Sequence, residues 1–240
     1  MFCFIAINLG IFATKFKKLA FILNIETATK NCSVSLAYNG ETISIKELND
    51  GGYSHAEKLH DFIKDVIKEA KIKITDLNAV AVSKGPGSYT GLRIGVSAAK
   101  GLCFALNIPL ISTNTLKALA LSISQPNSIV IPLLDARRME VYSEVFQHNT
   151  SIRKVNAEII DTTSFNEYLN ESEVYFLGDG AEKCKEIITH KNANFIDDKF
   201  PSSKEMSFIS FEKYKKNDIE DVAYFEPFYL KDFLVTTSKK

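Results

Sequence analysis

The chain has 240 residues, a length that fits either one large domain or two domains of about 100 residues each. Hydrophobic residues make up 45% of the sequence and charged residues 24%, which is typical of a globular protein and excludes a fibrous or largely disordered chain. The 29 basic and 29 acidic side chains give a formal net charge of zero. A protein that grips nucleic acid unaided usually carries a basic excess, because neutralising phosphates supplies most of that affinity.

The cysteines indicate reduced thiols rather than a disulfide framework or a metal site. Cys3, Cys32, Cys103 and Cys184 lie far apart and form no CxxC or Cys/His ligand pattern. Free thiols of this kind are typical of a reducing compartment, so we expect a cytoplasmic protein.

Residues 1–19 read as a separate N-terminal extension. Residues 2–13 are mostly apolar, but about 20 such residues are needed to span a bilayer. Lys15, Lys17 and Lys18 follow the apolar run, whereas a secretory signal carries its charges in front. We therefore expect no secretion, and three interpretations stay open: a disordered or loosely docked leader, an interfacial anchor, or a start codon assigned too far upstream.

Hydrophobic periodicity predicts the elements of the first half in chain order. Strands at 20–26, 32–38 and 42–48 form an antiparallel meander with a hairpin turn at Asn39-Gly40. A helix follows, beginning at Ser54 with capping-box spacing to Glu57 and reaching about residue 70. The remaining predicted elements are a strand at 78–83, a helix at 91–106, a strand at 110–112, and a helix capped by Thr113 or Asn114 that ends before Pro126.

The same order begins again at Ser128. It comprises strands at 129–135, 140–146, 152–158 and 174–177, a turn at Arg137-Arg138, a helix near 163–169 and a helix from about 181. Beyond residue 190 the pattern does not fix where any helix or strand lies. Because parallel strands need helical crossovers and hairpins do not, this repetition predicts a duplicated α/β architecture with lobes at 20–124 and 125–240.

The segment AVSKGPGSYTGLRIGVSAAKGLC at 81–103 places three glycines between a buried strand and a helix start. Free backbone N–H groups and the helix dipole could hold an anion or nucleotide there. The candidate residues are Lys84, Gly85, Gly87, Ser88, Thr90 and Arg93. The spacing matches neither a P-loop nor a dinucleotide fingerprint, and Pro86 excludes the elbow of a Ser88 hydrolase nucleophile. The alternative is that the glycines only permit a tight turn and close contact between helix and sheet.

The helix in this segment has a side that is almost free of side chains, formed by Gly91, Gly95, Ala98, Ala99 and Gly101. A glycine inside a helix costs about 1 kcal/mol relative to alanine, so a compensating contact is expected. Either the sheet of the same lobe or a partner helix approaches this side, and the sequence leaves both open.

Several titratable residues could carry chemistry. His55 and His60 are five residues apart on one helix, whereas helical metal pairs are three or four apart, so we expect surface or interface histidines. Glu26 and Asp135 end the first strands of the two halves and could face each other as metal–phosphate carboxylates. Alternatively, each accepts hydrogen bonds within its own turn. Gly178-Asp179-Gly180 is either a nucleotide contact or a turn.

Six segments of the sequence together match the pattern of a known protein family. They are ILNIETAT (22–29), SHAEKL (54–59), SKGPGSYTGLRIGVSAAKGL (83–102), IPLISTNTLKALA (108–120), DARRMEVY (135–142) and EPFYLKDF (226–233). Together they resemble the TsaB family of threonylcarbamoyladenosine-biosynthesis subunits, formerly called YeaZ. The resemblance is close through residues 20–147 and weak over 150–225.

The resemblance implies a duplicated actin-like ATPase (ribonuclease-H-like) fold of two lobes, each a mixed sheet with flanking helices, with the last residues able to return to the first lobe. It implies a non-catalytic subunit that heterodimerises with a TsaD-type threonylcarbamoyltransferase and activates it for modification next to the tRNA anticodon, joined by a TsaE-type ATPase. tRNA is then contacted only through the complex, no membrane is involved, and the lone chain can form a homodimer. No catalytic residue, metal or cofactor of its own is implied, although ATP or ADP could bind at the interface.

Family interfaces use the first two helices. The expected partner-binding residues are Leu59, Ile63, Gly91, Leu92, Gly95, Ala98, Ala99 and Leu102. A bulky residue at Gly95 or Ala99 is therefore expected to abolish pairing while leaving the fold intact.

This sequence departs from the family in two places. Residues 1–19 are extra, which favours the upstream-start interpretation, and Glu26 stands where many members have aspartate. Two other functions are considered: an actin-fold ATP-dependent phosphotransferase that uses Glu26 and Asp135, and a glycoprotease-like peptidase. The sequence shows neither a hydrolase triad nor a metal pair, which argues against the peptidase.

Overall fold

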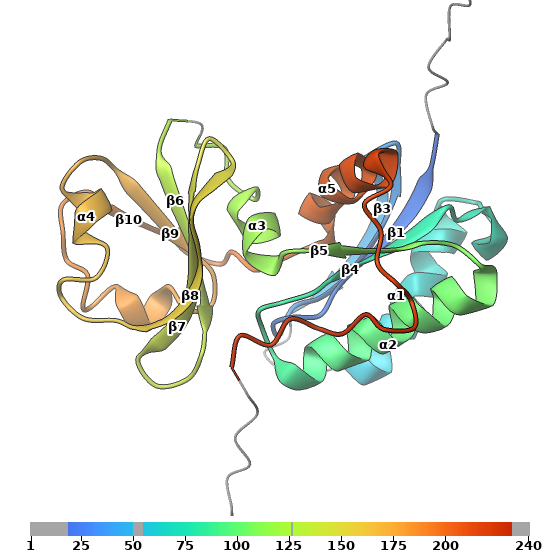
Figure 1. Ribbon diagram of the computed structural model, residues 1–240, viewed down its shortest axis with the longest axis horizontal. Helices are drawn as coiled ribbons and strands as arrows, with labels where there is room; N and C mark the ends of the chain where they lie inside the picture. The colour runs from blue at the N-terminus through green and yellow to red at the C-terminus, as the bar shows by residue number, and fades with distance from the viewer. Residues whose placement is uncertain (1–18, 50–54, 126, 232–240) are drawn as a thin grey trace, which may run out of the picture.

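The computed structural model describes residues 19–49, 55–125 and 127–231. Two five-stranded mixed sheets stand side by side, each with helices on its faces (Figure 1). The strands are β1 (Phe21–Glu26), β2 (Cys32–Tyr38), β3 (Glu41–Leu48), β4 (Ala79–Ser83), β5 (Leu110–Thr113), β6 (Ile129–Asp135), β7 (Glu140–Gln147), β8 (Thr150–Ile159), β9 (Val174–Leu177) and β10 (Ala193–Ile196). The helices are α1 (His55–Glu69), α2 (Tyr89–Leu106), α3 (Thr115–Ala120), α4 (Asn166–Leu169), α5 (Ser203–Lys216) and the short 3-10 turns η1 (Ile74–Asp76) and η2 (Glu182–Cys184).

The first sheet has the strand order β3-β2-β1-β4-β5. Its antiparallel part turns at Asn39 and Gly40, which have φ angles of 55° and 88°, the left-handed conformations that a two-residue hairpin requires. β4 runs parallel to β1, and β5 runs parallel to β4. Parallel neighbours need a crossover, and α2 supplies the one between β4 and β5.

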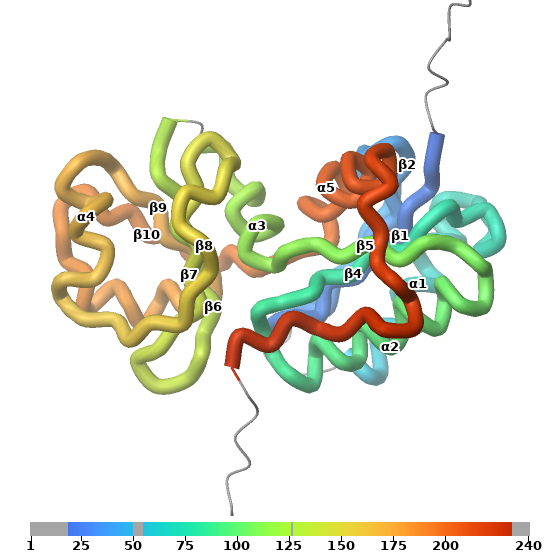
Figure 2. Tube along the Cα trace, in the orientation of Figure 1, coloured from blue at the N-terminus to red at the C-terminus, as the bar shows by residue number. Residues whose placement is uncertain are grey.

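Helices α1 and α2 cover one face of the first sheet, and α5 lies on the opposite face (Figures 1 and 2). Leu59 and Val66 of α1 and Val96 of α2 belong to one buried cluster with the strands beneath them. α2 begins at Ser88, whose hydroxyl accepts from the Gly91 N–H, and ends at Asn107 in the left-handed conformation. The α1–α2 pair is thus packed directly on the first sheet.

The second sheet repeats the first with less helix. Its order, β10-β9-β6-β7-β8, matches β5-β4-β1-β2-β3 strand for strand, with the same parallel and antiparallel pairs. In the position of the 15-residue α1 stands the four-residue α4, and in that of the 18-residue α2 stands the three-residue η2. Within the described residues, a pair of long helices on one face therefore occurs in the first lobe alone.

The last helix of each repeat crosses to the other sheet. α3 follows β5 but packs on β6 and β7, and α5 follows β10 but packs on the first sheet. Leu116 of α3 shares a buried cluster with Phe146 of β7, and Met206 of α5 shares one with Ile22 of β1. This exchange joins the two lobes.

The structure confirms the predicted first-half elements to within about two residues, including the Asn114 cap of α3, although α3 ends already at Ala120. In the second half the helix predicted from residue 181 is wrong, because only the single turn η2 forms there. β10 and α5 lie beyond residue 190, where the sequence pattern does not fix any element. Residues 125–240, predicted as one lobe, include α5, which packs on the first sheet. Ser54 and residues 1–18 lie outside the described residues.

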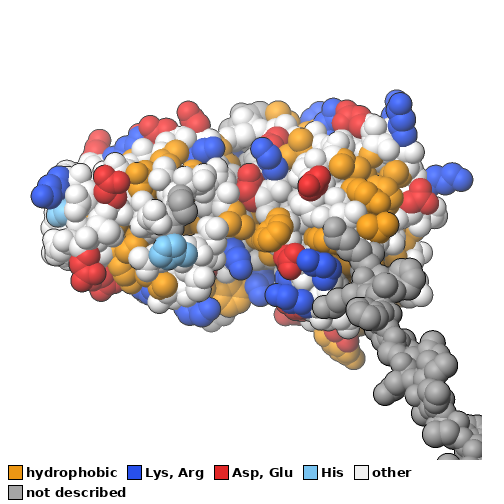
Figure 3. Space-filling model, turned by 90° about the horizontal axis from the view of Figure 1, so that it is seen from above, with side chains coloured by type: hydrophobic (Ala, Val, Ile, Leu, Met, Phe, Trp, Pro, Cys, Tyr) orange, Lys and Arg blue, Asp and Glu red, His pale blue; other side chains and the backbone are white. Residues whose placement is uncertain are grey.

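Acidic and basic side chains are mixed on the surface, as the equal numbers of both in the sequence would suggest (Figure 3). Seen from above, acidic and basic side chains are interspersed over both lobes (Figure 3). None of the described helices combines the length and the apolar character that a membrane span requires. The described cysteines, Cys32, Cys103 and Cys184, are free and buried.

Candidate functional site

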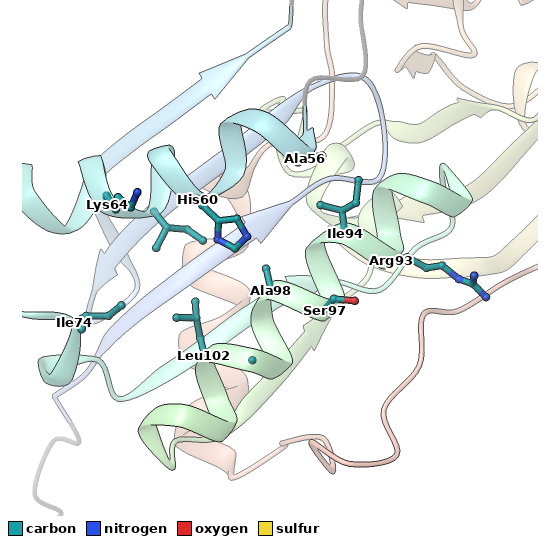
Figure 4. Close-up of a pocket in the computed structure, with 11 residues that line it drawn as sticks. Ala56, His60, Lys64, Ile74, Arg93, Ile94, Ser97, Ala98 and Leu102 are labelled. Atoms are coloured by element: carbon teal, nitrogen blue, oxygen red, sulfur yellow. The ribbon is translucent and has the colours of Figure 1, made fainter.

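A groove runs between α1 and α2 on the outside of the first lobe (Figure 4). It has a volume of about 710 Å³, and apolar side chains form most of its wall. Its lining comprises Ala56, His60, Ile63 and Lys64 of α1, Ile74 of η1, and Arg93, Ile94, Ser97, Ala98, Gly101 and Leu102 of α2. An apolar groove between two neighbouring helices has the shape that accepts a helix of a partner protein.

Helical spacing brings the α2 side chains into one line. Ile94, Ala98 and Leu102 recur every four residues, so they share one face of the helix, and in Figure 4 they point toward α1. Gly101 lies beside them, and no atom stands within 4 Å of the position that a Cβ would take there. With two small residues on this face, the backbone of another helix can approach α2 closely.

Gly91 and Gly95, on the small-residue side of α2, face the interior of the chain. A Cβ at Gly91 would stand under 3.0 Å from the Thr27 carbonyl oxygen, and one at Gly95 under 3.0 Å from the Thr27 hydroxyl oxygen. These glycines therefore let α2 lie directly against the turn after β1.

Five of the eight expected partner-binding residues lie in the interior of the chain, outside the lining of the groove. Leu59, Gly91, Leu92, Gly95 and Ala99 are buried within the chain itself. Ile63, Ala98 and Leu102 line the groove, although only 4% of Ile63 is exposed. Ile94 and Gly101 line it too, but neither is among the eight expected partner-binding residues. The sequence indicates Gly101 only as part of the small-residue side, and the four-residue spacing from Ala98 would have indicated Ile94.

The glycine-rich loop before α2 is held by its own chain. The Ser88 N–H donates to the Ala28 carbonyl at 2.7 Å, and the Ser88 hydroxyl caps α2. A Cβ at Gly87 would stand under 3.0 Å from the same carbonyl oxygen, and Gly85 has a φ of +111° beside the Phe228 carbonyl. These contacts favour the interpretation that the glycines serve a tight turn and close contact between backbones.

The comparisons with known proteins agree with this architecture. The family model "TsaD: tRNA N6-adenosine threonylcarbamoyltransferase" matches residues 50–237. The chain is 27% identical to "tRNA threonylcarbamoyladenosine biosynthesis protein TsaB" of Haemophilus influenzae over 224 residues, which cover 88% of this chain and 93% of that protein. The chain belongs to the TsaB (YeaZ) family, within the wider TsaD family. It is also 35% identical to the Escherichia coli TsaB over 130 residues, 53% of this chain and 55% of that protein.

A solved structure of the family shows the same fold. YeaZ from Pseudomonas aeruginosa has a TM-score of 0.74 to this chain at 22% identity, and the alignment covers 88% of this chain and 100% of the other. This likeness establishes the two-lobed actin-like architecture and extends no further than the fold.

In this TsaB-family chain Glu26 is fully buried at the end of β1. Its Oε1 accepts hydrogen bonds from the Ala28 N–H and the Ser83 hydroxyl, both at 2.7 Å. Burial raises the pKa of Glu26 from 4.5 to about 7, against the opposing effect of these hydrogen bonds. The hydrogen bond to Ala28 confirms that Glu26 accepts within its own turn.

Asp135 has partners of its own in the second lobe. Its carboxylate accepts from the Arg137 N–H within the turn and forms an ion pair with Lys183. The Lys183 ammonium also donates to the carbonyls of Arg138 and Glu140, so a lysine occupies the centre of the β6–β7 turn. The Asp179 carboxylate accepts a hydrogen bond from the Asp135 N–H. This bond favours the interpretation of 178–180 as a turn.

The metal and histidine predictions can be compared with the geometry. Among the described residues, no three His, Cys, Asp or Glu side chains gather as a metal site would require. His60 is exposed and lines the groove, in agreement with an interface residue. His55 is buried, with Nε2 donating to the Thr29 carbonyl at 2.7 Å, so its placement on the surface is wrong.

The candidate anion-binding residues stay a prediction. Thr90 and Arg93 are exposed at the start of α2, and Lys84 is half-buried. The Lys84 N–H donates to Thr113, and its carbonyl accepts from Phe228 at 2.7 Å. Part of the loop backbone is thus already paired internally.

Proposed function

We propose that this chain is a non-catalytic partner subunit that pairs with a TsaD-type threonylcarbamoyltransferase and activates it for threonylcarbamoyladenosine formation in tRNA. The single observation that carries the proposal is the exposed apolar groove between α1 and α2. The names of the relatives, "tRNA threonylcarbamoyladenosine biosynthesis protein TsaB" and "tRNA N6-adenosine threonylcarbamoyltransferase", supply the pathway.

The groove suits a helical partner. Ile63, Ile94 and Leu102 form apolar parts of its wall. Ala98 and Gly101 have small side chains or none, so the backbone of a partner helix can come close to α2. An amphipathic helix places its own apolar residues at intervals of three and four, and these can fit between the side chains of two neighbouring helices. A TsaD-type partner built on the same duplicated fold would offer an equivalent helix pair, which together with α1 and α2 makes a four-helix bundle.

The absence of catalytic activity is supported by the state of the two carboxylates. Glu26 is buried, with one oxygen bonded inside its own turn, and Asp135 is paired with Lys183. The Lys183 ammonium offsets part of the negative charge with which Asp135 would attract a metal–phosphate complex. The phosphotransferase alternative therefore has no specific observation in its favour.

The remaining partners belong to the same proposal. We place a TsaE-type ATPase in the assembly, contact with tRNA through the complex alone, and self-association of the lone chain through the same groove. A nucleotide at the interface would be bordered by Lys84, Thr90 and Arg93, since Thr90 and Arg93 are exposed next to the groove.

Reconstitution tests the proposal directly. The purified chain is mixed with the TsaD-type and TsaE-type subunits of the same organism, and the nucleosides of the treated tRNA are measured by mass spectrometry. Threonylcarbamoyladenosine is expected only when this chain and the TsaD-type subunit are both present. Modification of equal extent without this chain would refute the activating role, and modification by this chain alone would refute the non-catalytic one.

A further inference from the structure

The C-terminal segment, residues 217–231, crosses the first lobe beside α2 (Figure 2). It forms no helix or long strand, and each of its side chains is exposed or half-buried. The Lys100 ammonium holds it through the carbonyls of Ala223 and Phe225, at 3.1 and 3.0 Å. The Phe228 N–H donates to the Lys84 carbonyl, and Lys231 pairs with Glu140 of the second lobe.

The end of this segment meets Arg93. The Arg93 Nε donates to the Tyr229 hydroxyl at 3.2 Å, and the guanidinium lies 4.1 Å from the centre of the Tyr89 ring. The rings of Tyr89 and Tyr229 are themselves 4.8 Å apart. Arg93 is therefore fixed between two tyrosines, although it is an exposed side chain that would otherwise sample many rotamers.

Arg93 also lines the groove, and its positive charge is not neutralised by a described carboxylate. The described lining contains His60, Lys64 and Arg93 and no carboxylate. Lys64 already pairs with Asp61 at 3.5 Å, whereas no described carboxylate lies within 4.0 Å of the Arg93 guanidinium. Glu226 acts on Arg93 only from a greater distance.

We propose that the C-terminal segment positions Arg93, through Tyr229, to pair with an acidic side chain that flanks the apolar face of the partner's helix. This inference rests on the proposed function and adds a determinant of partner choice. A planar guanidinium that is already oriented loses little further freedom when it binds a carboxylate with its two terminal nitrogens. Tyr229 is thus a positioning residue, and Arg93 is the residue that makes the contact.

Calorimetry with the TsaD-type subunit of the same organism tests the inference. Arg93→Gln is expected to weaken binding about three- to tenfold and to reduce its salt dependence, as removal of an interfacial charge does. Tyr229→Phe keeps the ring on Tyr89 and removes the hydroxyl, and is expected to weaken binding by about half of that factor on a logarithmic scale. The double variant should bind like Arg93→Gln alone, because both changes act through one contact. Lys154→Gln, which removes an exposed cation from β8, is the matched control and should leave binding unchanged.

A second measurement needs no partner. In the free chain, ¹⁵N relaxation of the Arg93 Nε–H should report a rigid side chain in the wild type and a mobile one in Tyr229→Phe. An equally rigid Arg93 in that variant would overturn the positioning role. Unchanged binding by Arg93→Gln, fully additive effects, or tighter binding by Tyr229→Phe would overturn the docking role. Failure of the wild type to bind at all would instead refute the proposed function, on which this inference rests.

Discussion

Gly95 of α2 faces Thr27 so closely that a Cβ at residue 95 would stand under 3.0 Å from the Thr27 hydroxyl oxygen. The Thr27 side chain, in the turn after β1, therefore lies directly against the backbone of the first half of α2. Six residues further along the same helix, Gly101 has open space at the equivalent position. One helix thus carries glycines for two different purposes.

Gly95→Ala should destabilise the fold by about 1–3 kcal/mol, because the added methyl group forces α2 or the turn to move. Gly101→Ala is the matched control. It should leave the free energy of unfolding unchanged or raise it by up to about 1 kcal/mol, through the higher helix propensity of alanine. Urea denaturation of both variants measures the difference, and equal stability of the two would contradict the account of Gly95.

Glu26 should make stability depend on pH. Its folded pKa of about 7 lies above the ordinary 4.5, so its contribution is fully present below about pH 4.5 and is lost as the pH rises through 7. The difference corresponds to roughly 3 kcal/mol. Glu26→Gln keeps an oxygen for Ala28 and Ser83 but does not titrate, so the loss of stability between about pH 5 and pH 8 should shrink by that order. Denaturation across this range tests it, and parallel pH profiles for the two proteins would show the buried carboxyl to be unimportant.

The polar contact between α5 and the first sheet should be sensitive to one hydroxyl. Ser33 Oγ lies 2.7 Å from Ser203 Oγ and accepts from the Ser203 N–H at 3.1 Å, both in the interior. Ser33→Ala leaves these groups buried without that partner, which costs about 1–3 kcal/mol. Hydrogen exchange of the α5 amides should then accelerate. Thr42→Ala, which removes a more accessible bond to Ser207, is the control and should have a smaller effect; the opposite order would contradict this view of α5.

The first lobe could be predicted from sequence because its elements have strong local signals. Asn39-Gly40 can form only a few turns, and Ser88 and Asn114 cap helices whose apolar residues recur at regular intervals. α5 has no such signal. Its inward face includes Ser203, Ser207 and Ser210, which bond to polar residues of the first sheet, so its sequence lacks the apolar stripe that reveals a helix.

The groove could be predicted only in part, because the sequence shows which residues of α2 are small but not which of them face a partner. Small residues on α2 indicate a close approach, but composition does not say which side of the helix faces the chain itself. Gly91 and Gly95 meet Thr27, a contact fixed by the register of β1, which lies more than sixty residues earlier in the chain. The place of Arg93 depends equally on Tyr229, a residue 136 positions away. Long-range contacts of this kind are settled by the tertiary fold.

The most direct test of the central claim is the affinity of this chain for the TsaD-type subunit, measured by calorimetry for the wild type, Ala98→Glu and Ala105→Glu. Ala98 lines the groove, whereas Ala105 is exposed on the same helix outside the lining. We expect Ala98→Glu to weaken binding at least about a hundredfold, because the larger side chain would occupy the space that the partner's helix needs and its carboxylate would lose its hydration against an apolar surface, while Ala105→Glu should bind like the wild type. Equal affinity of Ala98→Glu and the wild type would show that the groove between α1 and α2 is not the docking surface.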